Sequence, residues 1–112
     1  MSKCDLLLLI AISLTLTTPA SADCYDVFGC SDTTYFRAAD LRDGPNCEFL
    51  WQMRNSIYSQ RGYCFHTQRG IQAFGNAGCK FADIDRVPLN QFERANASTV
   101  QSVETSMHCS AD

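Results

Sequence analysis

Three stretches of this chain place their apolar residues three and four positions apart, which is the spacing of one face of an α-helix. The most regular stretch covers residues 47–60. Asn46 stands where an N-cap side chain is expected, and Gly62 stands just past the end. We therefore predict a helix over residues 47–60. Its expected inward face consists of Cys47, Leu50, Trp51, Arg54, Ile57 and Tyr58.

A shorter helix is predicted over residues 68–74. Thr67 precedes it as a cap, and the Gly-Asn-Ala-Gly sequence of residues 75–78 turns the chain after it. Ile71 and Phe74 lie one turn apart, so we expect both side chains to face inward.

The third predicted helix covers residues 91–107. Asn90 and Glu93 stand three positions apart at its start, which is the spacing of a capping box. The expected inward stripe is Phe92, Asn96, Val100, Val103 and Met107. Because Asn96 is a polar residue in this stripe, we expect its side chain to bond to a neighbouring backbone.

The first 22 residues have the pattern of a secretory signal. An apolar run over residues 6–16 follows Lys3 and is too short for a comfortable membrane span. Residues 20–22, Ala-Ser-Ala, form a small-x-small cleavage site, so the mature chain is expected to begin at Asp23. The alternative is a retained membrane anchor. We expect a secreted or periplasmic protein without a transmembrane span in its mature part.

The rest of the chain divides into an irregular N-terminal segment, residues 23–45, and a helical domain, residues 46–112. Few periodic apolar positions occur in the first part. The expected fold is mainly α, a small disulfide-stapled bundle of about three helices with long loops.

Seven cysteines occur in the chain, and six follow the signal segment. An even number in a short exported domain indicates disulfides, and six cysteines allow fifteen pairings. If the first and third helices are antiparallel, Cys47 meets Cys109. Cys64 and Cys79 flank the middle helix and can staple it. The expected pairs are therefore Cys47–Cys109, Cys64–Cys79 and Cys24–Cys30.

Composition argues against several classes of function. The formal net charge is −3, which does not favour nucleic acid as a partner. His66 and His108 are the only histidines, and oxidised cysteines leave no thiol nucleophile or zinc ligand beside them. No carboxylates stand out as a glycosidase pair. We therefore expect no catalytic residues, no metal site, no cofactor and no enzymatic activity.

Arg54 lies within the apolar face of the first helix. A charge near a core is usually paired, so we expect Arg54 to be structural and to meet a carboxylate such as Glu104. The alternative is an anion or glycan contact at the surface.

Residues 54–65 read Arg-Asn-Ser-Ile-Tyr-Ser-Gln-Arg-Gly-Tyr-Cys-Phe. This segment resembles the core of the YARHG domain family, which is named for a Tyr-Ala-Arg-His-Gly string. Residues 58–62 keep the first and last of these five, Tyr58 and Gly62, and the flanks match better. Further positions similar to the family are Phe74, Leu89, Glu93, Asn96 and Glu104. The resemblance covers residues 46–104.

The resemblance implies a small extracellular bacterial domain with a role at the cell wall or in envelope sensing. It carries over no catalytic residues. Cys64 and Cys79 depart from the family pattern, and we interpret them as a disulfide that replaces an aromatic staple.

The same segment supplies the candidate binding residues. Tyr58, Tyr63 and Phe65 can form an aromatic platform for sugar rings, with Arg61 and Arg69 as a basic rim. The competing interpretation is that the aromatic rings are core and the arginines are solvated. We expect a non-enzymatic cell-envelope domain that binds peptidoglycan or another cell-wall component. The alternatives are an inhibitor or effector that binds an envelope protein, and an enzyme acting on cell-wall polymer.

Overall fold

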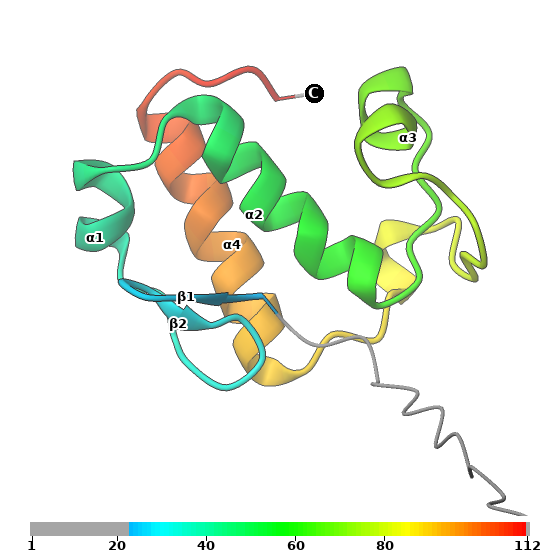
Figure 1. Ribbon diagram of the computed structural model, residues 1–112, viewed down its shortest axis with the longest axis horizontal. Coiled ribbons are helices and arrows are strands. Elements are labelled where there is room, and N and C mark those ends of the chain that lie inside the picture. Colours follow the sequence, from blue (N-terminus) through cyan, green and yellow to red (C-terminus); the bar gives the residue numbers. More distant parts are fainter. Residues whose placement is uncertain (1–22, 112) are drawn as a thin grey trace, which may run out of the picture.

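Two antiparallel helices, α2 (Cys47–Gln60) and α4 (Gln91–Ser106), form the centre of the protein in a computed structural model that describes residues 23–111 (Figure 1). The strands β1 (Cys24–Tyr25) and β2 (Gly29–Cys30) and the helix α1 (Ala38–Asp43) precede them. Between them lie α3 (Gln68–Phe74) and a short 3₁₀ helix, η1 (Ile84–Arg86). The protein is therefore mainly helical, as predicted, with one small two-stranded sheet.

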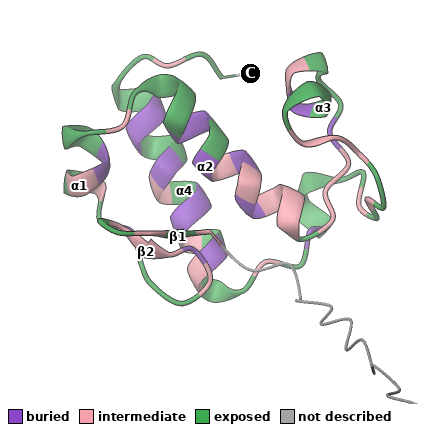
Figure 2. Ribbon diagram, in the orientation of Figure 1, coloured by how far each residue is buried: buried purple, intermediate pink, exposed green. Residues whose placement is uncertain are grey.

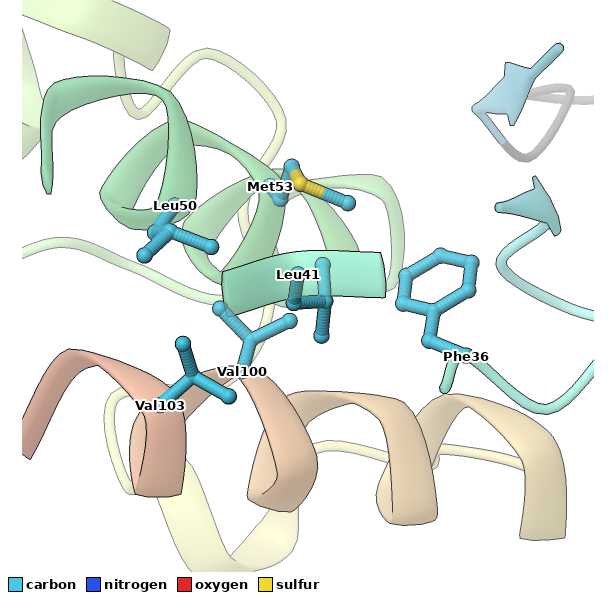
Figure 3. Packing of buried hydrophobic residues seen from close by; sticks show 6 residues of the cluster. All are labelled: Phe36, Leu41, Leu50, Met53, Val100 and Val103. Atoms are coloured by element: carbon cyan, nitrogen blue, oxygen red, sulfur yellow. The ribbon is translucent and has the colours of Figure 1, made fainter. Parts of the chain in front are cut away.

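The hydrophobic core fills the space where α1, α2 and α4 meet. Its buried members are Phe36, Leu41, Leu50, Met53, Val100 and Val103 (Figure 3). The buried positions of α2 and α4 face each other, while the outer turns of α1 and α3 are exposed (Figure 2). Burial of this apolar seam supplies the main driving force for folding.

Residues 23–45 are more ordered than the sequence pattern indicated. β1 and β2 form an antiparallel pair in which Cys24 lies opposite Cys30. Phe36 and Leu41 are 5% and 0% exposed and belong to the core. This segment therefore differs from the irregular extension that we expected. It has no apolar periodicity because single side chains, spaced irregularly, cover one end of the α2–α4 seam.

The helices begin and end close to the predicted residues. Asn46 accepts the Phe49 N–H at 2.9 Å, and Thr67 accepts the Gly70 N–H at 3.0 Å. At the start of α4 both halves of the capping box are present. These side chains satisfy N–H groups that no helical carbonyl can reach, and they fix where each helix starts.

Each of the three expected inward faces was partly wrong. On α2, Cys47 is exposed, and Met53 is buried although it was not expected to face inward. Ile71 is 43% exposed, and the one buried residue of α3 is Gly70. On α4, Met107 is 37% exposed because it lies past the last helical residue. The buried stripe of α4 is rotated toward charged positions and consists of Glu93, Asn96, Ala97, Val100, Val103 and Glu104. The apolar pattern of the sequence could not predict this rotation, because two of the buried side chains, Glu93 and Glu104, are charged and are buried in ion pairs.

Three disulfides join the cysteines of the described residues in the pairs expected from the helix order. Cys47–Cys109 ties the start of α2 to the end of α4, with Cα atoms 5.5 Å apart. Cys64–Cys79 brackets α3, and Cys24–Cys30 closes the hairpin.

The expected signal segment, residues 1–22, and its cleavage site lie outside the described residues. Within residues 23–111, none of the helices combines the length and the apolar character that crossing a membrane requires.

Candidate functional site

A groove of about 480 Å³ lies beside the segment that resembles the family motif. Residues 59–63 line one side, and residues 74–75, residues 77–81 and Pro88 line the other. We call it the motif groove. It combines the end of α2 with the loop that follows α3, so the turn after α2 and the Cys64–Cys79 disulfide together determine its shape.

Gly62 allows the backbone to turn at the base of the motif groove. Its φ of 92° lies in the left-handed region, which a side chain disfavours. Its carbonyl oxygen accepts the N–H groups of Lys80 at 2.7 Å and Phe81 at 3.0 Å. The Cys64 N–H then donates to the Phe81 carbonyl at 2.8 Å. These bonds hold the two sides of the groove together.

Among the described residues, two cationic side chains and no acidic one belong to the lining of the motif groove. Arg61 donates through Nε to both carboxylate oxygens of Glu93, at 3.1 and 2.8 Å, and this bonding raises the pKa of Arg61. The Glu93 side chain is 1% exposed and that of Arg61 is 41% exposed. Arg61 is thus anchored to α4, and Lys80 is the second exposed cation of the lining.

The predicted aromatic platform is a row of rings of which only Tyr63 reaches the motif groove. The Tyr63 ring meets Tyr58 and Phe65 edge-on, with centroids 6.1 and 5.0 Å apart. Phe65 is 5% exposed and stacks on Phe74 at 5.2 Å, so it belongs to the packed interior. Tyr58 is half-buried, and this burial raises the pKa of its hydroxyl.

Arg69 lies away from Arg61, so the two do not form one basic rim. Its guanidinium lies 3.9 Å from the centre of the Trp51 ring and forms an ion pair with Glu48. A cation over an aromatic face is a stabilising contact in its own right. The structure thus brings Tyr58, Tyr63 and Phe65 together but directs the two arginines to different partners.

Of the three residues expected to be structural, Arg54 and Glu104 join α2 to α4, and Asn96 joins α4 to the segment before α1. Arg54 donates to both carboxylate oxygens of Glu104, at 2.6 and 3.1 Å. The Asn96 side chain accepts the Phe36 N–H at 2.8 Å. It also donates to two carbonyl oxygens, those of Ser31 and Thr34. Asn96 therefore fastens the segment before α1 onto α4.

A second groove, of about 370 Å³, was not anticipated from the sequence. It lies between the β-hairpin, α2 and α3, and we call it the hairpin groove. Its lining residues are Asp23, Tyr25, Phe49, Gln52, Met53, Ser56, Ala73 and Phe74. The available signal was Phe49, an aromatic residue outside the predicted inward face of α2, which is 40% exposed.

Within residues 23–111, no group of three or more His, Cys, Asp or Glu side chains is arranged to hold a metal ion. No curated protein and no solved structure matches the chain. A family comparison does: the model of the YARHG domain matches residues 24–105. This range runs from β1 into the last turn of α4 and includes the motif groove. The chain therefore belongs to the YARHG domain family, a family of small extracellular domains.

Proposed function

We propose that this protein is a non-enzymatic module of the cell envelope that binds an anionic cell-wall polymer in the motif groove. The observation that carries the proposal is the composition of this groove. Its lining holds Arg61, Lys80 and Tyr63 but no carboxylate, although the whole chain carries a net charge of −3. A cleft lined by one sign of charge concentrates ligands of the opposite sign.

The chemistry of the lining suits such a ligand. Lys80 offers an ammonium group for carboxylates, which the peptide stems of cell-wall polymer carry, and the Tyr63 ring offers an aromatic surface. Arg61 is held by Glu93 and therefore contributes a positioned guanidinium with little remaining freedom. A side chain that is already ordered loses less entropy when a ligand binds.

The shape of the groove supports binding to a preformed site. The Gly62 carbonyl bonds to the loop opposite, and the Cys64–Cys79 disulfide closes the same loop. The Asn76 side chain adds two bonds to the Phe65 backbone, at 2.7 and 2.9 Å. Preorganisation of this kind improves affinity without new contacts.

The test is retention of the purified protein on isolated sacculi, followed by titration with soluble muropeptides under residue-resolved NMR. We expect retention and chemical-shift changes confined to residues 59–63 and 77–81. Lys80→Glu reverses the accessible charge and should abolish retention. Arg86→Ala is the matched control, because Arg86 is 82% exposed and lies outside the groove lining.

Three outcomes would overturn the proposal. Equal retention of the Lys80→Glu variant would exclude the motif groove. Absence of retention together with recovery of a tight protein partner would favour an inhibitor or effector. Release of new sugar or peptide fragments would identify an enzyme.

A further inference from the structure

Two oxygen atoms of the hairpin groove accept no hydrogen bond from the side chains of residues 23–111, and both lie beside aromatic rings. Asp23 is held in place from two directions: its carbonyl accepts the Ser31 N–H at 2.9 Å, and its Oδ2 accepts the Ser56 hydroxyl. Tyr25 lies within 3.5 Å of the same Oδ2. Within residues 23–111, no side chain donates to the other carboxylate oxygen, Oδ1, and no Lys, Arg or His side chain forms an ion pair with Asp23.

Gln52 supplies the second acceptor. Its amide nitrogen donates to Glu48 at 3.3 Å, one helical turn away, and this bond fixes which end of the amide carries the oxygen. No donor among the described residues reaches the Gln52 Oε1. The groove therefore presents two solvent-accessible acceptors to a ligand that brings donors.

The aromatic walls come from three different elements. Tyr25 of the hairpin and Phe49 of α2 meet edge-on, with centroids 5.9 Å apart, and Phe74 closes α3. Phe49 remains 40% exposed despite this packing. An exposed ring beside fixed acceptors offers an apolar face and hydrogen-bonding atoms to one ligand.

We infer that the hairpin groove binds a sugar ring, which stacks its C–H face on Phe49 and Tyr25 and donates hydroxyl or amide hydrogens to Asp23 and Gln52. A sugar ring combines an apolar C–H face with hydroxyl donors at its edge. A hydrocarbon lacks the donors, and a simple anion lacks the apolar face. This inference extends the proposed function and deepens it, because Phe74 lines both grooves. An elongated polymer can then place a sugar in the hairpin groove and an acidic group in the motif groove.

The test uses the exported protein and the N-acetylglucosamine tetrasaccharide as the probe, followed by residue-resolved NMR and calorimetry. We expect shifts at Tyr25, Phe49 and Gln52. Asp23→Asn and Phe49→Ala should each weaken binding about tenfold, the effect of about 1.4 kcal/mol. Tyr35→Ala is the matched control, an aromatic residue that is 54% exposed and lies outside both grooves.

Unchanged affinity of the Phe49→Ala variant, with its fold verified by circular dichroism, would overturn the inference. Saturation of the same residues by choline, a small ammonium compound without a sugar ring, would also overturn it. Lys80→Glu separates the two proposals. If that variant loses sacculus retention but the tetrasaccharide never binds, the inference alone fails. If the tetrasaccharide binds and Lys80→Glu is retained normally, the assignment of the motif groove alone fails.

Discussion

The α2–α4 pair and the lobe around α3, residues 61–82, reach stability by different means. The pair shares four core side chains, Leu50, Met53, Val100 and Val103. In the lobe, α3 buries only Gly70. Backbone bonds, Asn76 and the Cys64–Cys79 disulfide hold its chain instead. The motif groove lies where these two regions meet, so a rigid helix supplies one side and a stapled loop the other.

This comparison shows why a short chain can maintain a shaped groove. A small domain buries a limited fraction of its surface, and a loop rich in glycine loses much entropy when it is ordered. A disulfide reduces that entropy cost by restricting the unfolded chain. The lobe therefore keeps its shape although Phe65 is its one buried large apolar side chain.

Removal of the Cys47–Cys109 disulfide should have the largest effect. It spans a sequence separation of 62 residues, for which the chain-entropy model gives about 4 kcal/mol of unfolding free energy. The double variant Cys47→Ser with Cys109→Ser should melt far below the wild type in thermal denaturation. The matched variant Cys64→Ser with Cys79→Ser opens a separation of 15 residues and should lose about 3 kcal/mol.

Hydrogen exchange then separates the two regions. In the Cys64→Ser, Cys79→Ser variant, amide hydrogens should lose protection from exchange first in residues 61–82. Those of α2 and α4 should stay protected. Equal loss of protection throughout the chain would show that the two regions unfold as one unit.

The buried ion pair between the helices gives the next effect. Arg54→Ala leaves the Glu104 carboxylate, whose side chain is 5% exposed, without its cation. Removing one partner of a buried pair costs about 3–5 kcal/mol, and we expect the lower end because the Arg54 side chain is 13% exposed. Chemical denaturation measures the change. Arg86→Ala breaks a pair whose side chains are 82% and 57% exposed and should change stability by less than about 1 kcal/mol.

A smaller effect is expected from a methyl group added inside the lobe. Gly70→Ala would place its Cβ 2.6 Å from Phe65 Cδ1, so Phe65 and its stacking on Phe74 must shift. Overpacking of this kind costs about 1–3 kcal/mol. Gly44→Ala is the control, because nothing lies within 4 Å of its added Cβ. A Gly70→Ala variant as stable as the Gly44→Ala variant would show that the lobe adapts freely.

The smallest effect concerns alkaline pH. Burial, then the charge and hydrogen bond of Asp23, raise the pKa of Tyr25, and burial also raises that of Tyr58. Folding therefore favours the neutral phenols. Their contribution to stability is complete below the ordinary tyrosine pKa of about 10 and is lost as pH rises through the higher folded values. Phenolate absorbance of the native protein should rise at higher pH than that of the unfolded protein. Superimposed curves would contradict this, and Tyr25→Phe and Tyr58→Phe separate the two contributions.

The sequence predicted the helices well because their limits depend on local chemistry. Asn46, Thr67 and Asn90 cap the next residues along the chain, and each cap lies within three positions of its partner. The Arg54–Glu104 pair was also expected, since a charge within an apolar helix face is usually paired. The order of the helices then placed the cysteines near each other.

The two grooves required the tertiary structure. Arg61 was expected to belong to a basic rim or to be solvated, and the structure pairs it with Glu93, 32 positions along the chain. Asp23 meets Ser56, 33 positions away. No local pattern relates residues at such separations, because their distance depends on how the hairpin and α4 pack against α2.

By itself, the sequence determined the helices, their caps and the resemblance to the family. These features follow from hydrogen bonds between near neighbours and from periodic apolar positions, and both can be seen along one chain. The tertiary structure decided which charges are buried, that residues 23–45 complete the core, and where two grooves open. Those features depend on contacts between distant segments, where packing and ion pairing select one arrangement among many that the local pattern permits.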